Sequence, residues 1–197
     1  MDEVETERQQ LIKKKEINKS IKKIITDFDS IDDFREILIK SKLYLTSQSY
    51  GDIIESQIKK ILNISPQRDE ISGDGVFNNK TIEIKVSIEG TKSNFNFVQL
   101  RPSHNVDYYL LLTYSYTEDD LFFFLIPHED MITLIGKYAG YAHGTIKKQG
   151  EINRENVIKN LDKDYEYAIR PDYLKEEGSW KELKAYIIDI RKLKQLI

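Results

Sequence analysis

The sequence predicts an α/β protein with a mixed central β-sheet flanked by helices, and three observations support this fold class. The first third of the chain has apolar residues at helical spacing, whereas the middle has alternating and continuous apolar runs that are typical of strands. The length of 197 residues allows a sizeable core. We therefore expect one domain over residues 1–197, of which residues 1–45 form a helical portion.

Three helices are expected before the sheet begins. Apolar residues recur every three or four positions over residues 5–26, 31–43 and 50–62, and charged residues lie between them. Ser30, with Asp29 before it, supplies a cap for the second helix.

The stretch over residues 72–87 predicts a β-hairpin. Asp74 lies between two glycines, and Glu83 and Lys85 lie in a run where they alternate with apolar residues that face the core. Asn78 and Asn79 suit the tight turn between the two strands. Side chains two residues apart on a strand share one face, about 6.5–7 Å apart. The hairpin therefore brings Asp74 to Glu83 and Lys85.

Two carboxylates and a lysine in one small volume suit the hydrolysis of a phosphodiester. Carboxylate oxygens are ligands for a hard cation such as Mg²⁺, which keeps several waters for exchange with substrate. A metal-bound water is more acidic than bulk water, and a nearby ammonium orients the nucleophile or offsets phosphate charge. Mg²⁺ is therefore the predicted cofactor, and Asp74, Glu83 and Lys85 are the candidate catalytic residues.

These residues resemble the signature of a known family. Asp74 and the triplet Glu83-Ile84-Lys85 are similar to the Asp and Glu-x-Lys motif of the PD-(D/E)XK nuclease superfamily, especially of its type II restriction endonucleases. Gly73 stands where the motif name has proline. The resemblance implies a restriction-endonuclease-like core in which Asp74 and Glu83 bind Mg²⁺ and Lys85 positions the attacking water.

Glu55, in the third expected helix, has two interpretations. In the resembling nucleases a glutamate in the helix before the catalytic hairpin assists the metal site, which makes Glu55 a candidate metal-site residue. The alternative is an exposed glutamate that pairs with Lys59 at the i+4 spacing. Both interpretations stay open.

A second copy of the motif occurs near the end of the chain. It consists of Pro-Asp at residues 171–172 and Glu-Leu-Lys at residues 182–184. Only thirteen residues follow it, whereas further helices and strands follow the catalytic strand in the resembling family. Residues 173–180 are also charged and loop-like. We therefore expect the site at Asp74, and the second copy to be a strand entry with solvated charges.

The second half of the chain is expected to complete the sheet. Residues 106–114 and 121–126 are dense in tyrosine, phenylalanine and leucine, and they predict two adjacent buried strands. The remaining expected elements are a helix that starts at Pro127 with His128, a short helix over residues 153–161, strands over residues 165–170 and 185–190, and a loop between these strands with Trp180 as a packing anchor.

Two segments are candidates for contact with double-stranded DNA. In the resembling enzymes the segment after the catalytic strand passes close to DNA, and here it contains Gln99 and Arg101, which suit phosphate or base contacts. The alternative is a polar loop with ordinary surface bonds. Residues 136–152 form the second segment, whose glycines, tyrosines and lysines predict a loop that approaches a groove. Its candidate contacts are His143, Thr145, Lys147 and Lys148.

Composition sets further bounds. The net charge of −3 lacks the basic excess typical of nucleic-acid binders, although a local basic groove is compatible with it. The absence of cysteine excludes disulfides and thiolate zinc sites, and the three histidines lack metal-ligand spacing. No apolar run reaches membrane-spanning length, and the N-terminus lacks a secretory apolar region. We therefore expect a cytoplasmic protein without a membrane partner.

The predicted function is that of a Mg²⁺-dependent type II restriction endonuclease, which hydrolyses phosphodiester bonds at a specific sequence of double-stranded DNA. Two alternatives stay open: a structure-specific or repair nuclease with the same residues, and a non-catalytic DNA-binding or partner subunit with a nuclease-like fold. One chain has one such site, and cutting both strands requires two. A homodimer on a palindromic sequence is therefore expected, with a heterodimer with another nuclease subunit as the alternative.

Overall fold

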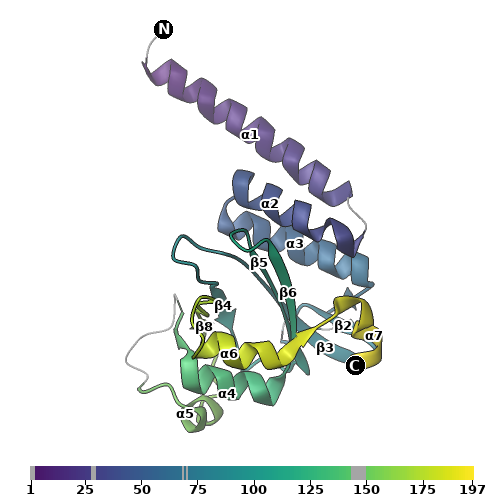
Figure 1. Ribbon diagram of the computed structural model, residues 1–197, viewed down its shortest axis with the longest axis vertical. Coiled ribbons are helices and arrows are strands. Elements are labelled where there is room, and N and C mark those ends of the chain that lie inside the picture. The colour runs from purple at the N-terminus through teal and green to yellow at the C-terminus, as the bar shows by residue number, and fades with distance from the viewer. Residues whose placement is uncertain (1–2, 28–29, 68, 70, 143–149) are drawn as a thin grey trace. The chain divides into compact units, whose positions relative to one another are not determined.

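The computed structural model describes residues 3–27, 30–67, 69, 71–142 and 150–197 (Figure 1). The chain divides into two compact units, Met1–Leu62 and Asn63–Ile197. The first unit therefore extends beyond the expected helical portion over residues 1–45 and includes the third helix. Within the described residues, no helix is both long enough and apolar enough to cross a membrane.

Helices make up the first unit, as the spacing of apolar residues predicts. They are α1 (Glu3–Asp27), the 3-10 helix η1 (Ile31–Asp33), α2 (Phe34–Tyr44) and α3 (Ser47–Leu62). Ser30 caps η1, because its hydroxyl accepts from the Asp32 amide (3.1 Å) and its amide donates to the Asp33 carboxylate (3.2 Å). The fully buried apolar side chains of α2 and α3 are Phe34, Ile37, Leu38, Ile54 and Ile58.

A six-stranded mixed sheet is the centre of the second unit. Its strands, in spatial order, are β1 (Ser65–Pro66), β2 (Gly75–Phe77), β3 (Lys80–Ile88), β5 (Tyr108–Ser115), β6 (Asp120–Pro127) and β9 (Ile187–Ile188). β3 and β5 are parallel, whereas the other neighbouring pairs are antiparallel. The predicted mixed central sheet flanked by helices is therefore confirmed, and β5 and β6 are the two expected buried strands.

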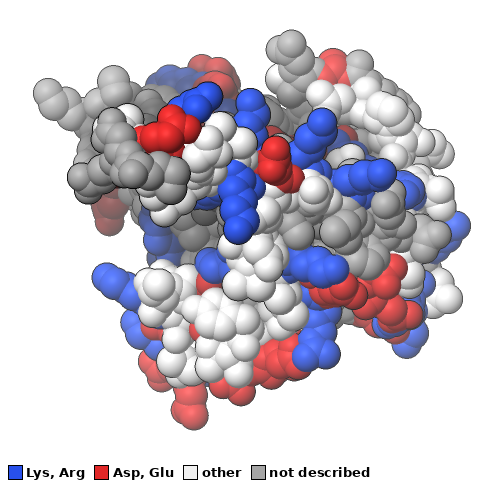
Figure 2. Space-filling model, turned by 90° about the horizontal axis from the view of Figure 1, so that it is seen from above, with Lys and Arg blue, Asp and Glu red and all other residues white. Residues whose placement is uncertain are grey.

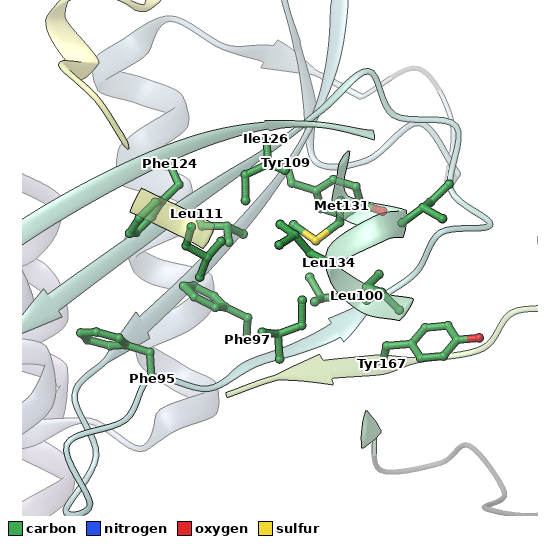
Figure 3. Packing of buried hydrophobic residues seen from close by; sticks show 14 of the residues in the cluster. Phe95, Phe97, Leu100, Tyr109, Leu111, Phe124, Ile126, Met131, Leu134 and Tyr167 are labelled. Carbon is green, nitrogen blue, oxygen red and sulfur yellow. The ribbon is translucent and has the colours of Figure 1, made fainter. Parts of the chain in front are cut away.

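A second, antiparallel sheet packs on the main core of this unit. Its strands, in spatial order, are β4 (Phe97–Leu100), β8 (Tyr167–Ile169) and β7 (Gly140–Tyr141). The same unit contains the helices α4 (His128–Tyr138), α5 (Arg154–Lys159) and α6 (Ser179–Leu183). Figure 3 shows the apolar side chains that fill the space between β4, β5, β6, β8 and α4, among them Phe97, Leu111, Phe124, Leu134 and Tyr167.

The C-terminal segment corrects two predictions. Half of the expected strand over residues 185–190 is replaced by the helical turns η3 (Lys184–Tyr186) and η4 (Ile190–Lys192). Between these turns lies the short strand β9, and α7 (Leu193–Leu196) follows η4. Trp180 lies in α6 and not in a loop. The helical turn places Trp180 and Leu183 at the i, i+3 spacing, so that both are buried.

The prediction that Trp180 is a packing anchor is confirmed. Its side chain is 3% exposed, and its ring centroid lies 5.3 Å from those of both Phe95 and Phe122. A third aromatic ring, that of Phe124, lies 5.6 Å away in an edge-on orientation. These separations are typical of favourable aromatic pairs.

The segment over residues 136–152 is partly regular structure, which corrects the prediction of one long loop. Gly136 lies in α4, where a Cβ would approach the Arg154 amide nitrogen to 2.4 Å, so the glycine permits close packing of α4 on α5. Gly140 and Tyr141 form β7 and pair with β8. The candidate DNA contacts His143, Thr145, Lys147 and Lys148 lie outside the described residues.

Candidate active site

The hairpin between β2 and β3 forms at the predicted turn. Asn78 and Asn79 have φ angles of 49° and 63°, in the left-handed region that asparagine adopts more readily than most residues. Phe77 and Lys80 close the turn as paired residues. Positive φ at both central residues is the requirement of a type I′ turn, which matches the twist of the flanking strands. The chain therefore runs out from Asp74 and returns along β3, as predicted.

Asp74 is held against β3 by two hydrogen bonds. Its amide donates to the carbonyl oxygen of Ile82 (2.8 Å), and its Oδ2 accepts from the amide of Ile84 (2.6 Å). Gly73 has a φ of 71°, and a Cβ at this position would lie 2.7 Å from the same carbonyl oxygen. Only glycine suits both constraints. The Asp74 carboxylate is thus bonded to the backbone of β3, at the residue that follows Glu83.

Glu83 and Lys85 form an ion pair on β3. The ammonium of Lys85 donates to Oε1 of Glu83, as expected for side chains on one face of a strand. The Glu83 side chain is only 5% exposed, and that of Lys85 is 20% exposed. Ile82 and Ile84 are buried, as the alternating pattern predicts. The pair is therefore largely removed from solvent.

The structure places His104, which belongs to the polar segment of Gln99 and Arg101 and has no metal-ligand spacing to the other histidines, beside Glu83. Its Nδ1 lies 3.7 Å from Oε2 of Glu83, which is within ion-pair range but too long for a direct hydrogen bond. This nitrogen is buried and has no hydrogen-bond partner among the described residues. Local periodicity contains no signal for this contact, because it joins a loop to a strand.

The pKa of Glu83 is low although the side chain is buried. Burial on its own raises the pKa of a carboxyl group, and here the neighbouring His104 and the ammonium of Lys85 outweigh that effect. Glu83 is therefore ionised at neutral pH, as a metal ligand must be. Burial and the charge of Glu83 both raise the pKa of Tyr109, the residue that pairs with Glu83 on β5. Its hydroxyl stays protonated and donates to the carbonyl oxygen of Arg101 (3.1 Å).

The donor set suits a hard divalent cation through two carboxylates, those of Asp74 and Glu83. Mg²⁺ is commonly held by one or two carboxylates together with waters and substrate phosphates. Across the part of the chain that the structure describes, no group of three or more histidine, aspartate or glutamate side chains is arranged around a metal position. Glu55 lies in α3 and pairs with Lys59 at 2.6 Å, as the alternative interpretation expects. Its metal role stays a prediction.

The two candidate DNA contacts after β3 have different surroundings. Gln99 is exposed in β4 and has a φ of 56°, at an irregularity of the pairing between β4 and β8. Arg101 donates from Nε to Glu166 (3.1 Å), also pairs with it through Nη2, and lies 3.5 Å from Asp164. These carboxylates give Arg101 the ordinary bonds of a polar loop. DNA contact by Gln99 and Arg101 stays a prediction.

Charges of both signs share the molecular surface. Figure 2 shows one face, on which lysine and arginine side chains are interspersed with aspartate and glutamate. This distribution agrees with the formal net charge of −3. A protein with this net charge has no strong long-range attraction for a polyanion such as DNA.

The second copy of the motif has a different local structure. Asp172 accepts a hydrogen bond from the amide of Leu174 (3.2 Å) within a turn. Glu182 lies in α6, where it accepts from the hydroxyl of Tyr138 (2.7 Å), and Lys184 begins η3. The expected strand entry is therefore wrong for this copy, because its Glu-x-Lys triplet lies on helical turns. On such turns, side chains two residues apart do not share one face.

Comparison with known proteins does not assign the chain to a family. No protein-family model matches the sequence, and no curated protein matches it. The resemblance to the PD-(D/E)XK nucleases therefore depends on Asp74, Glu83 and Lys85 and on the hairpin that presents them, and it stays a prediction.

Proposed function

We propose that this protein is a Mg²⁺-dependent endodeoxyribonuclease that hydrolyses phosphodiester bonds at a specific sequence of double-stranded DNA. The observation that supports this best is the hairpin geometry. Asp74 is bonded to the backbone of β3 next to Glu83, and Glu83 is paired with Lys85 in a largely buried position. Two carboxylates suit a hard divalent cation, and a nearby ammonium can orient the nucleophile or offset phosphate charge, so this set of groups suits metal-assisted hydrolysis of a phosphodiester.

Asp74 and Glu83 would hold the cation in this proposal. Mg²⁺, when bound, supplies Lewis acidity toward the phosphate and lowers the pKa of a coordinated water. Lys85 orients the attacking water and offsets the negative charge that develops on the phosphate. The hydrogen bond from the Ile84 amide fixes the orientation of Asp74, so little reorganisation is needed when substrate binds.

Two copies of the chain would act together. A single hairpin provides one hydrolytic site, and a double-strand break needs one site for each strand. A homodimer with two-fold symmetry matches a palindromic DNA sequence. A heterodimer with a second nuclease subunit is the competing arrangement, and size measurements on the purified protein with and without DNA distinguish the two.

Digestion of long unmethylated DNA tests the proposal. Purified protein is incubated with and without Mg²⁺, beside the variants Asp74→Ala and Asp172→Ala. We expect discrete Mg²⁺-dependent fragments that disappear in Asp74→Ala and persist in Asp172→Ala, which is the matched control from the second motif copy. Loss of cleavage only in Asp172→Ala would move the site to that copy. Cleavage of branched but not linear DNA would indicate a nuclease that recognises DNA structure and not a specific sequence.

A further inference from the structure

We propose that His104 is a positioning residue, which holds the Glu83 carboxylate in the orientation that a divalent cation requires. This inference rests on the proposed nuclease function. The ammonium of Lys85 donates to Oε1 of the Glu83 carboxylate. The Nδ1 of His104 lies 3.7 Å from the other oxygen of this carboxylate, Oε2. Each oxygen of the carboxylate thus has one nitrogen neighbour.

The imidazole of His104 is largely buried beside the Glu83 carboxylate. Its side chain is 13% exposed, and its Nδ1 has no hydrogen-bond partner among the residues that the structure describes. A buried polar atom without a partner costs roughly 1–3 kcal/mol, so its retention calls for an explanation. The charged Glu83 carboxylate, whose Oε2 lies 3.7 Å from this nitrogen, supplies that explanation.

Hydrogen bonds hold the start and the middle of the loop that carries His104. At the start, the hydroxyl of Tyr109 donates to the carbonyl oxygen of Arg101 (3.1 Å), and the His104 amide donates to the same oxygen (3.1 Å). In the middle, the Asn105 amide donates to the carbonyl oxygen of Ile71 (2.8 Å). The loop is therefore a fixed support for the imidazole.

The far end of this loop is anchored on β3 itself. Asp107 accepts from the amide (2.8 Å) and from the hydroxyl (3.0 Å) of Thr81, and Lys80 donates to it as well (2.9 Å). Thr81 lies two residues before Glu83 on β3. These bonds tie the end of the loop that carries His104 to the strand that carries Glu83.

The chemical effect of His104 follows from the geometry of a carboxylate. A single contact from Lys85 to Oε1 leaves the carboxylate free to turn about the bond that joins it to the side chain. A second nitrogen at Oε2 defines the plane and directs the remaining lone pairs. Loss of such a partner to a ligating group typically lowers metal affinity by about 10–100-fold.

Mn²⁺ binding to the full chain, followed by electron paramagnetic resonance, tests this inference without any cleavage step. His104→Leu removes both ring nitrogens, whereas His104→Asn keeps an amide at the position of Nδ1. His128→Leu is the matched control, because the Nδ1 of His128 is also buried with no hydrogen-bond partner in the described part of the chain, and its ring stacks on Tyr109 at 6.0 Å. Glu83→Gln reports whether the bound ion is at the proposed site.

We expect His104→Leu to bind Mn²⁺ about tenfold more weakly or worse, while His104→Asn and His128→Leu stay near the unmutated protein. Equal affinity in His104→Leu would overturn the inference and leave the nuclease proposal intact. A loss in His104→Asn as large as in His104→Leu would also overturn it, because packing of the ring would then be the cause. Mn²⁺ binding that is absent, or insensitive to Glu83→Gln, would overturn both proposals.

Thermal unfolding of each variant is measured alongside. If His104→Leu does not fold, His104→Gln takes its place, because its amide extends past the position of Nδ1 while the side chain stays polar. The comparison between His104→Gln and His104→Asn then carries the same expected difference in Mn²⁺ affinity.

Discussion

Replacement of Glu89 by glutamine tests how the end of the site strand is held. Glu89 directly follows β3 and is 1% exposed. Its Oε2 accepts from the Ser115 hydroxyl (3.0 Å) and the Thr117 amide (3.0 Å), and its Oε1 accepts from the hydroxyls of Thr117 (2.8 Å) and Tyr173 (2.9 Å). Glutamine has a single acceptor oxygen, so it can accept at most two of these bonds, and both become neutral. The donors that faced the other oxygen meet an NH2 group, which cannot accept from them. With about 0.5 kcal/mol for each bond that is weakened and about 1 kcal/mol or more for each bond that is lost, the free energy of unfolding falls by at least about 2 kcal/mol.

The difference in free energy of unfolding between the unmutated protein and Glu89→Gln should change with pH in a defined direction. Burial raises the pKa of Glu89, but hydrogen bonds from Thr117, Tyr173 and Ser115 outweigh it and lower the pKa in the folded state. The stabilisation from the charge is therefore present above the unfolded-state pKa, near 4.5, and is lost as pH falls through the folded-state pKa. The difference between the unmutated protein and Glu89→Gln should narrow in acid.

Urea denaturation at several pH values measures both effects. Glu118→Gln is the matched control, since Glu118 is an exposed glutamate in the adjoining turn and its neutralisation should cost less than about 0.5 kcal/mol. The reasoning is refuted if Glu89→Gln at neutral pH loses no more than this control. It is also refuted if the difference widens as the pH falls.

Three further predictions concern the packing anchor and the hairpin. Trp180→Ala should lower the free energy of unfolding by about 3–5 kcal/mol in urea denaturation, and a loss near zero would contradict its role as an anchor. Gly73→Ala should destabilise the protein by more than about 1 kcal/mol and weaken Mn²⁺ binding in calorimetry, because the left-handed backbone and the 2.7 Å contact with Ile82 both oppose a Cβ. Asn79→Val should lose about 1–2 kcal/mol in thermal unfolding, whereas Asn79→Gly should not; equal effects would argue against the turn geometry.

Short-range patterns were sufficient for the hairpin and for the central strands. Asn78 and Asn79 sit between two strand-forming runs, and the alternation around Glu83 distinguishes the two faces of β3. Each signal depends on residues that are neighbours in the chain. Turn chemistry and side-chain period act over that same short range, so the sequence contains enough to locate them.

The same reasoning fails where one helical turn or one close contact decides the structure. The segment around Trp180 has only a single apolar pair at helical spacing, which is too short to distinguish a helix from a loop. Gly136 looks like a loop glycine in the sequence, yet its function is to admit the backbone of Arg154. Burial against a distant partner selects the conformation at both positions.

The sequence by itself determined the α/β class, the hairpin and the placement of Glu83 and Lys85 on one face of its second strand. Only the tertiary structure decided which groups surround them. His104 reaches Glu83 because β3 and β5 are parallel neighbours, and the loop that enters β5 therefore lies beside the start of β3. Arg101 contacts Glu166 because these residues lie next to the ends of β4 and β8, which are neighbouring strands of the second sheet. Such contacts join segments that are far apart along the chain, and no local period specifies them, since the free energy of burial and pairing depends on the whole fold.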